Sequence, residues 1–194
     1  MSKLPKIDIE EVRKFISTQS KGSKIYLGCD SNLIKKRGMW YADYVTVIVI
    51  HMEDPNIPGR FVGGKIFGEV EREPDYTVKL DKPNMRLLNE VMKTAALFDK
   101  LQDIIGNRQV EIHLDINTDP EYASNQVAQQ AIGYIRGVCG LEPKIKPDAF
   151  AASYCADRFM RVKDYDITKV DRQKGFGYVL QRSKTLKKKK KIAG

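Results

Sequence analysis

The strongest constraint on the fold is a pair of apolar, β-branched runs separated by a short basic turn. Residues 24–30 (KIYLGCD) and 44–51 (YVTVIVIH) have the composition of buried strands. The segment 33–43 between them contains KKRG at 35–38, a turn signal, so we expect an antiparallel hairpin. A third, more polar strand is predicted over residues 60–70, after a turn rich in Pro and Asp. The three strands should form an antiparallel meander.

The rest of the chain alternates helices and short strands. Apolar residues recur at helical spacing in four segments, and two short segments have strand patterns. The predicted helices span residues 8–18, 84–101, 121–137 and 150–161, and the further strands span residues 110–115 and 143–146. This order predicts an α/β fold with a mixed five-stranded sheet, in which two parallel strands join the meander and helices cover both faces. Residues 176–180 have the composition of an extra strand.

The length of 194 residues fits one hydrophobic core with an appendage. We expect a domain over residues 1–165 that includes the short N-terminal helix, an extension over residues 166–181, and a Lys-rich, disordered tail over residues 182–194. The sequence contains no apolar run long enough to cross a bilayer, and no apolar stretch follows its basic start. These features predict a cytoplasmic protein.

Charge indicates the class of partner. The formal net charge of +9 favours a polyanion, because Lys and Arg that contact phosphates release counterions. Nucleic acid is therefore the predicted partner, although part of the charge belongs to the lysine run at 187–191. The three cysteines, Cys29, Cys139 and Cys155, lack the paired spacing of zinc or redox motifs and are expected to be reduced thiols.

Two acids end predicted strands. Asp30 ends the first strand and Asp115 ends the fourth, so both carboxylates emerge at one edge of the sheet if these strands are parallel neighbours. Adjacent carboxylates repel unless a cation lies between them, and oxygen ligands suit Mg²⁺ or Mn²⁺. Two such ions, held about 4 Å apart, can promote phosphodiester hydrolysis. The structural alternative is that each Asp only begins a turn or caps a helix.

Four blocks of the sequence resemble the YkuK-type ribonuclease H-like proteins of bacteria. The blocks are IYLGCDSN at 25–32, the strand at 45–51, EIHLDIN at 111–117, and KIKPD at 144–148 with its continuation to Asp157. They occur in the order of that family and cover about residues 20–160. The resemblance implies the ribonuclease H-like fold and, with it, a two-metal nuclease site.

The wider superfamily implies four acids, carried by the first strand, the first helix, the fourth strand and the last helix. In this sequence they correspond to Asp30, Glu90, Asp115 and either Asp148 or Asp157. Glu90 lies at the edge of its apolar helix stripe, so it either turns toward the sheet or is a solvated surface glutamate. We prefer Asp148 because it directly follows a strand and its KPD context resembles the helix entry of RuvC-type resolvases. A plain N-cap is the alternative for Asp148, and Asp157 remains the alternative fourth acid.

Several polar and basic residues near these acids are candidates for substrate binding. The candidates are Ser31, Asn32, Lys35, Lys36, Arg37, Lys144 and Lys146. Trp40, Tyr41 and Tyr44 would add stacking surfaces to the basic hairpin, or else simply pack. His113 shares a strand face with Asp115 and either assists proton transfer or is a hydrogen-bonded structural histidine.

The sequence supports two functions of different classes. The leading hypothesis is a nuclease that uses Mg²⁺ or Mn²⁺, as two ions, to cleave RNA, RNA–DNA hybrid or structured DNA. The alternative is a nucleic-acid-binding protein that keeps the fold without cleavage. A scaffold that binds through its lysine run is a further option, while a sugar-kinase-like phosphotransferase is disfavoured by the short chain and the lack of Gly-rich phosphate loops.

Overall fold

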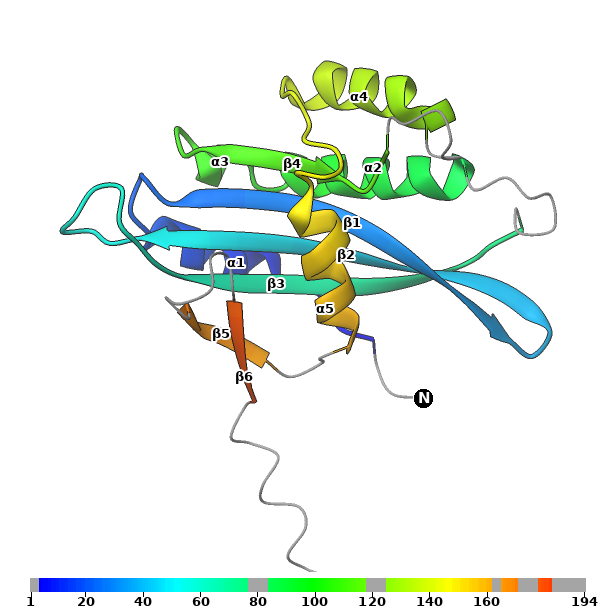
Figure 1. Cartoon of the computed structure of the whole chain (residues 1–194), viewed down its shortest axis with the longest axis horizontal. Coiled ribbons are helices and arrows are strands. Elements are labelled where there is room, and N and C mark those ends of the chain that lie inside the picture. The colour runs from blue at the N-terminus through cyan, green and yellow to red at the C-terminus, as the bar shows by residue number, and fades with distance from the viewer. Residues whose placement is uncertain (1–3, 77–83, 118–124, 162–164, 171–177, 183–194) are drawn as a thin grey trace, which may run out of the picture.

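The computed structural model describes residues 4–76, 84–117, 125–161, 165–170 and 178–182 (Figure 1). A four-stranded sheet dominates it, with helices packed around the sheet and a small separate hairpin near the end of the chain. The elements in chain order are α1 (Ile9–Ser17), β1 (Lys24–Lys36), β2 (Met39–Glu53), β3 (Phe61–Pro74), α2 (Asn84–Asp99), α3 (Gln102–Ile105), β4 (Val110–Leu114), α4 (Asn125–Cys139), the π-helical turn η2 (Ala151–Cys155), α5 (Ala156–Arg161), β5 (Tyr165–Val170) and β6 (Tyr178–Arg182).

The strand order of the main sheet is β3-β2-β1-β4. β1 pairs antiparallel with β2, β2 pairs antiparallel with β3, and β4 lies parallel to β1. The predicted meander and the parallel placement of β1 and β4 are therefore confirmed. β5 and β6 form a separate antiparallel pair that overlaps the predicted extension over 166–181 and exceeds it by one residue at each end. The described part of the strand expected at 176–180 belongs to β6, and residues 176–177 lie outside the described residues.

The predicted fifth strand of the main sheet is reduced to an isolated bridge between His113 and Lys144. The Lys144 amide donates to the carbonyl of Ile112, and the Leu114 amide donates to the carbonyl of Lys144, at 2.8 Å each. Proline at 143 and 147 explains the short pairing, because proline has no amide hydrogen to donate to a ladder. The segment extends the β4 edge for only a few residues.

β1 and β2 are longer than the sequence predicted. The two strands continue through the expected loop at 33–43 and meet at a two-residue turn in which Arg37 and Gly38 have φ angles of 50° and 81°. Two residues with positive φ favour the twist of a tight hairpin, so strand pairing extends up to the turn. As a result, Asp30 lies inside β1 and not at its end.

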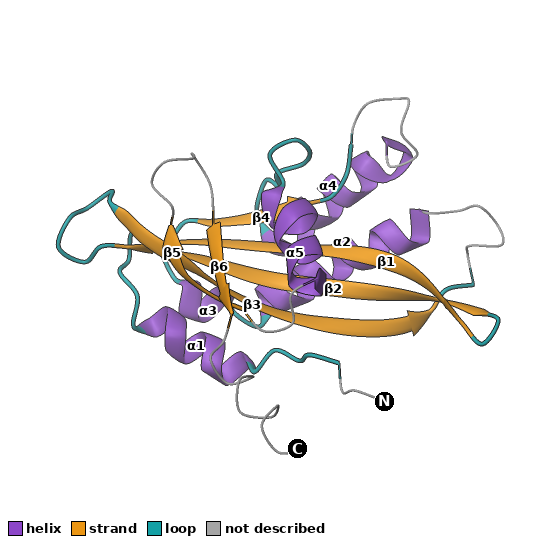
Figure 2. Ribbon diagram, turned by 60° about the horizontal axis from the view of Figure 1, so that its bottom comes forward, coloured by secondary structure: helices purple, strands orange, loops and turns teal. Residues whose placement is uncertain are grey.

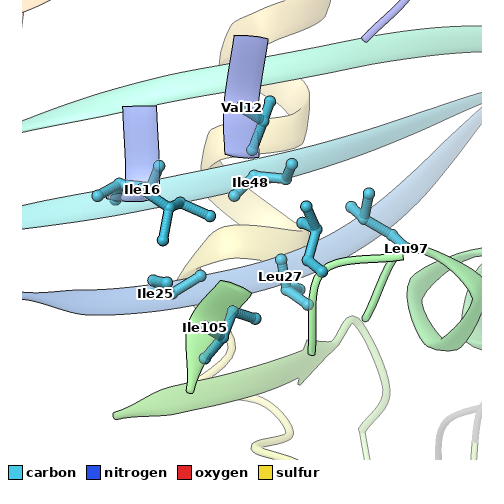
Figure 3. Close-up of a cluster of buried hydrophobic side chains, with 9 residues drawn as sticks. Val12, Ile16, Ile25, Leu27, Ile48, Leu97 and Ile105 are labelled. Carbon is cyan, nitrogen blue, oxygen red and sulfur yellow. The ribbon is translucent and has the colours of Figure 1, made fainter. Parts of the chain in front are cut away.

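Helices cover both faces of the sheet, as expected (Figure 2). α1, α2 and α3 enclose one core against β1 and β2, part of which Figure 3 shows. The residues of this core are Val12, Ile16, Ile25, Leu27, Ile48, Ile50, Leu97, Leu101 and Ile105. η2 and α5 pack on the other face against Tyr26 and the β2 valines, and α4 packs outside α2. None of the described helices is both long enough and apolar enough to span a bilayer.

Two glycines allow the η2 and α5 layer to approach the sheet closely. A Cβ atom at Gly28 of β1 would lie 2.5 Å from the backbone nitrogen of Ala152, and one at Gly68 of β3 would lie 2.9 Å from the ring of Phe159. Both distances are too short for a real contact, so only glycine fits beneath this layer. The π-helical turn η2 is thereby held directly over β1 at Gly28, which lies two residues before Asp30.

Candidate functional site

The candidate site lies where β4 separates from β1. The last paired residues are Cys29 and Leu114, so Asp30 and Asp115 follow at equivalent positions on neighbouring parallel strands. This confirms the predicted neighbourhood of the two strands that carry these acids. The alternation of strand residues places both acids on the sheet face that η2 covers. The amide of Ser31 donates to Oδ1 of Asp30 at 2.7 Å.

Glu90 joins the two aspartates from α2, on the opposite face of the sheet. Its side chain is buried, with 5% exposure, and Ser31 Oγ donates to its Oε1 at 2.5 Å. The alternative of a solvated surface glutamate is therefore wrong. Burial raises the pKa of Glu90 to about 8, and the negative charges of Asp30 and Asp115 contribute to the rise. Ser31 and Arg86 oppose that shift without cancelling it.

The carboxylate of Asp115 is incompletely satisfied. Its Oδ1 is buried and has no hydrogen-bond partner among the described residues. Lys146 Nζ lies 2.9 Å from this oxygen, so the two groups form an ion pair, but their orientation does not make a hydrogen bond. Lys146, a predicted substrate-binding residue, is thus the cation beside Asp115. Its side chain is 43% exposed and retains access to solvent.

The donor set of this cluster fits a hard divalent cation. Asp30, Glu90 and Asp115 supply only carboxylate oxygens, and the pKa of Glu90 is raised mainly by burial and further by the charges of the two aspartates. No group of three or more His, Cys, Asp or Glu side chains within the described ranges is gathered closely enough to hold a metal ion. Glu90 comes from α2 on one face of the sheet, whereas the alternation of strand residues places Asp30 and Asp115 on the other face.

The two candidates for a fourth acid differ in what the structure describes. Asp148 is exposed in the turn before η2, where its amide donates to the carbonyl of Ile145 at 2.9 Å. Burial lowers the pKa of His113, and the negative charge of Asp148 is the smallest of the contributions that oppose this. The N-cap of η2 is Phe150, which makes no side-chain capping bond, so the N-cap alternative for Asp148 is not supported. The side chain of Asp157, in α5, lies outside the described residues.

His113 has the surroundings of a structural residue. It is fully buried, and its Nδ1 accepts a hydrogen bond of 3.0 Å from the amide of Ala151. The ring proton therefore belongs on Nε2, which lies 3.3 Å from Oε2 of Glu111. Burial lowers the pKa of His113, and its ring packs against Tyr26 and Phe150. These contacts fasten η2 to β4 and favour the structural alternative over proton transfer.

Arg86 is a basic residue near the cluster that the sequence analysis missed. It lies four residues before Glu90 on α2, so the two side chains share one helix face. Its Nε is buried without a hydrogen-bond partner among the residues described, and its positive charge lowers the pKa of Glu90. The four-residue spacing between Arg86 and Glu90 could have indicated Arg86 from the sequence, because it places both side chains on one helix face.

The other predicted substrate-binding residues fall into two groups. Ser31 and Asn32 are half-buried beside the acids, whereas Lys144 is exposed at the β4 edge. Lys35, Lys36 and Arg37 lie at the tip of the β1–β2 hairpin.

The hairpin aromatics also differ from one another. Lys35 Nζ lies 5.5 Å from the ring centroid of Trp40, which remains half-exposed, as does Tyr41. Tyr44 is buried, accepts a hydrogen bond from Asn89 and lies beneath Lys93, so its role is packing.

Comparison with known proteins agrees with the strand order and the acid positions. The sequence profile of a family described as ribonuclease H-like matches residues 8–161, which include the main sheet, all helices and the candidate acids. No curated protein and no solved structure matched the chain. The family match indicates a nuclease-like or nucleic-acid-binding function. The chain belongs to the ribonuclease H-like family.

Proposed function

We propose that the protein is a divalent-metal-dependent nuclease that hydrolyses phosphodiester bonds in RNA, RNA–DNA hybrid or structured DNA. One observation carries the proposal: the carboxyl of Glu90 is buried where β4 leaves β1, and the negative charges of Asp30 and Asp115 act on it. Burying an unbalanced carboxylate is costly, and such groups concentrate at functional sites. Membership of the ribonuclease H-like family supports the same chemistry.

In this proposal Asp30, Glu90 and Asp115 hold Mg²⁺ or Mn²⁺, with Asp148 as the preferred fourth ligand and Asp157 as the alternative. Two bound ions would supply a water of lowered pKa and stabilise charge on the phosphate. Ser31 orients Glu90 through its hydrogen bond.

Basic residues of the chain would hold the substrate. Lys146 and Arg86 bring positive charge to the two sides of the acid cluster. Lys144 continues this charge along the β4 edge, beside Lys146. Phosphate contacts by such residues position a nucleic acid without reading its sequence.

The test is a cleavage assay with Mg²⁺ or Mn²⁺ on single-stranded, duplex, hybrid and branched substrates. We expect metal-dependent cleavage by the wild type, and its loss in Asp30→Asn with nucleic-acid binding retained. Asp99→Asn is the matched control, because Asp99 is an exposed residue about 13 Å along α2 from Glu90. Equal cleavage by Asp30→Asn and the wild type would overturn the proposal.

A second candidate, a nucleic-acid-binding protein without cleavage, is favoured by one specific contact. The Lys146 ammonium lies 2.9 Å from Asp115, where it neutralises a carboxylate that the nuclease would use for metal. If this pairing is the functional state, no substrate is cleaved, and Asp30→Asn leaves binding unchanged with or without Mn²⁺. The same assay therefore separates the two functions.

A further inference from the structure

The tip of the β1–β2 hairpin is a two-stranded ribbon that extends beyond the rest of the sheet. β4 leaves β1 after Cys29, and β3 pairs with β2 only as far as Tyr41, so within the described part of the chain residues 35–40 pair as strands only with each other. Asp75 and Tyr76 lie beside Gly38, Met39 and Trp40. The amide of Asp75 donates to the carbonyl of Trp40 at 2.9 Å and fastens the base of the ribbon. Figures 1 and 2 both show the tip at one end of the sheet, apart from the helices.

The ribbon is basic and has no acid of its own. Residues 31–42 contain Lys35, Lys36 and Arg37 and no Asp or Glu. Because strand side chains alternate, Lys35 and Lys36 project from opposite faces of the ribbon. Met39, at 46% exposure, and Leu33, at 38%, leave apolar surface beside these charges. Positive charges beside exposed apolar side chains suit a polyanion that also carries apolar or aromatic groups.

The shape of the ribbon restricts the polyanion further. Its tight turn, with positive φ at Arg37 and Gly38, makes it a preformed element whose ordering costs no loop entropy on binding. A two-stranded ribbon fits the major groove of B-form DNA, which is about 12 Å wide. The major groove of A-form duplexes is too deep and narrow for side chains to read. Cations on both faces of the ribbon can reach phosphates on both walls of the groove.

The register of β1 fixes the distance between the ribbon and the candidate acids. Lys36 lies six residues after Asp30 on one continuous strand, which corresponds to about 20 Å. That span equals about six steps of 3.4 Å along a DNA strand. A duplex whose axis runs along the ribbon would therefore reach the acid cluster about six base pairs from the arm.

We propose that the β1–β2 hairpin tip is a docking arm for B-form duplex DNA, which it enters by the major groove about six base pairs from the acid cluster. This rests on the proposed function for its nucleic-acid partner, and it selects duplex DNA as the substrate class. The arm would bind the duplex whether or not the acids cleave it.

Binding in EDTA tests the arm without any cleavage. Full-length protein is titrated against a fluorescent 20-base-pair DNA duplex, the RNA–DNA hybrid of the same sequence and the single strand. The variant is Lys35→Gln/Lys36→Gln/Arg37→Gln. The matched control is Lys187→Gln/Lys188→Gln/Lys189→Gln, which removes three positive charges from the lysine run at the end of the chain. Thermal melting of both variants checks that the fold is retained.

We expect the hairpin variant to lose at least about tenfold in affinity for duplex DNA at 0.1 M salt, and much less for the hybrid and the single strand. The slope of log K against log salt should fall by up to about 2.7, at about 0.9 for each phosphate that the variant no longer neutralises. The tail variant should lose affinity for all three ligands to the same extent. Two results would contradict the proposed docking arm. One is an equal loss of affinity for the three ligands in the hairpin variant, and the other is a wild type that prefers the hybrid or the single strand.

Duplex length provides a second measurement that separates this inference from the proposed function. On duplexes shortened from 20 to 8 base pairs, which still span the six base pairs between the arm and the acid cluster, the wild type should keep its higher affinity over the hairpin variant. If no metal yields cleavage but this binding pattern holds, the nuclease fails and the arm stands. If cleavage occurs but the hairpin variant matches the wild type at every length, the arm fails and the nuclease stands.

Discussion

Glu90→Gln should change how the stability of the protein depends on pH. The pKa of Glu90 is about 8 in the folded protein, against an ordinary value of 4.5. Between these two values the folded state binds more protons than the unfolded state, so stability falls as pH rises. At about 1.4 kcal/mol per pKa unit, the wild type should lose about 4 kcal/mol from this group between about pH 5 and pH 9. Glutamine carries no charge and removes this loss.

The assay is urea denaturation in EDTA at several pH values over that range. The stability difference between Glu90→Gln and the wild type should shift in favour of the variant by several kcal/mol as pH rises. The hydrogen bond from Ser31 is already included in the pKa of about 8, and the amide oxygen of glutamine can still accept it. The control is Glu142→Gln, because Glu142 is exposed and Arg136 lowers its pKa, so this variant should show no trend above about pH 5. A stability difference between Glu90→Gln and the wild type that does not vary with pH would refute the raised pKa of Glu90.

Two other variants test the surroundings of the site. Gly28→Ala would place a Cβ atom 2.5 Å from the backbone of Ala152 and should destabilise the fold by about 1 to 3 kcal/mol or more, whereas Gly133→Ala meets open space on α4 and should be neutral or stabilising in thermal melts. An equal response of the two would contradict the close approach of η2. Lys146→Gln removes the cation beside Asp115 and should tighten Mn²⁺ binding several-fold in calorimetry while weakening nucleic-acid binding. Unchanged Mn²⁺ affinity would show that this lysine does not compete for the carboxylate.

The neighbourhood of Asp30 and Asp115 could be predicted because it depends on strand order alone. β1 and β4 lie as parallel neighbours although β2, β3 and two helices separate them in the chain, and the acids at equivalent positions then lie side by side. The place of Asp30 within its strand could not be predicted, since it depends on how far the hairpin closes. The φ angles of Arg37 and Gly38, which permit full closure, are a property of the turn and not of the strand pattern.

Tertiary packing decided the features that the sequence left open or missed. The rotation of α2, which buries Glu90 and brings Arg86 beside it, follows from the contacts of the whole helix with β1, β4 and α4. The strand expected at 143–146 shrank to one bridge because its flanking prolines lack amide hydrogens. His113 was assigned correctly to the face of Asp115, yet only the fold shows that Ala151 donates to its ring.

Mn²⁺ titration of the full-length protein tests whether Asp30, Glu90 and Asp115 together bind a divalent cation. The free Mn²⁺ signal in electron paramagnetic resonance would be measured for the wild type, Asp30→Asn, Asp115→Asn and the control Asp99→Asn. We expect saturable Mn²⁺ binding by the wild type and the control, and at least tenfold weaker binding by the other two variants. Equal Mn²⁺ binding by all four proteins, or no binding by the wild type, would contradict this expectation.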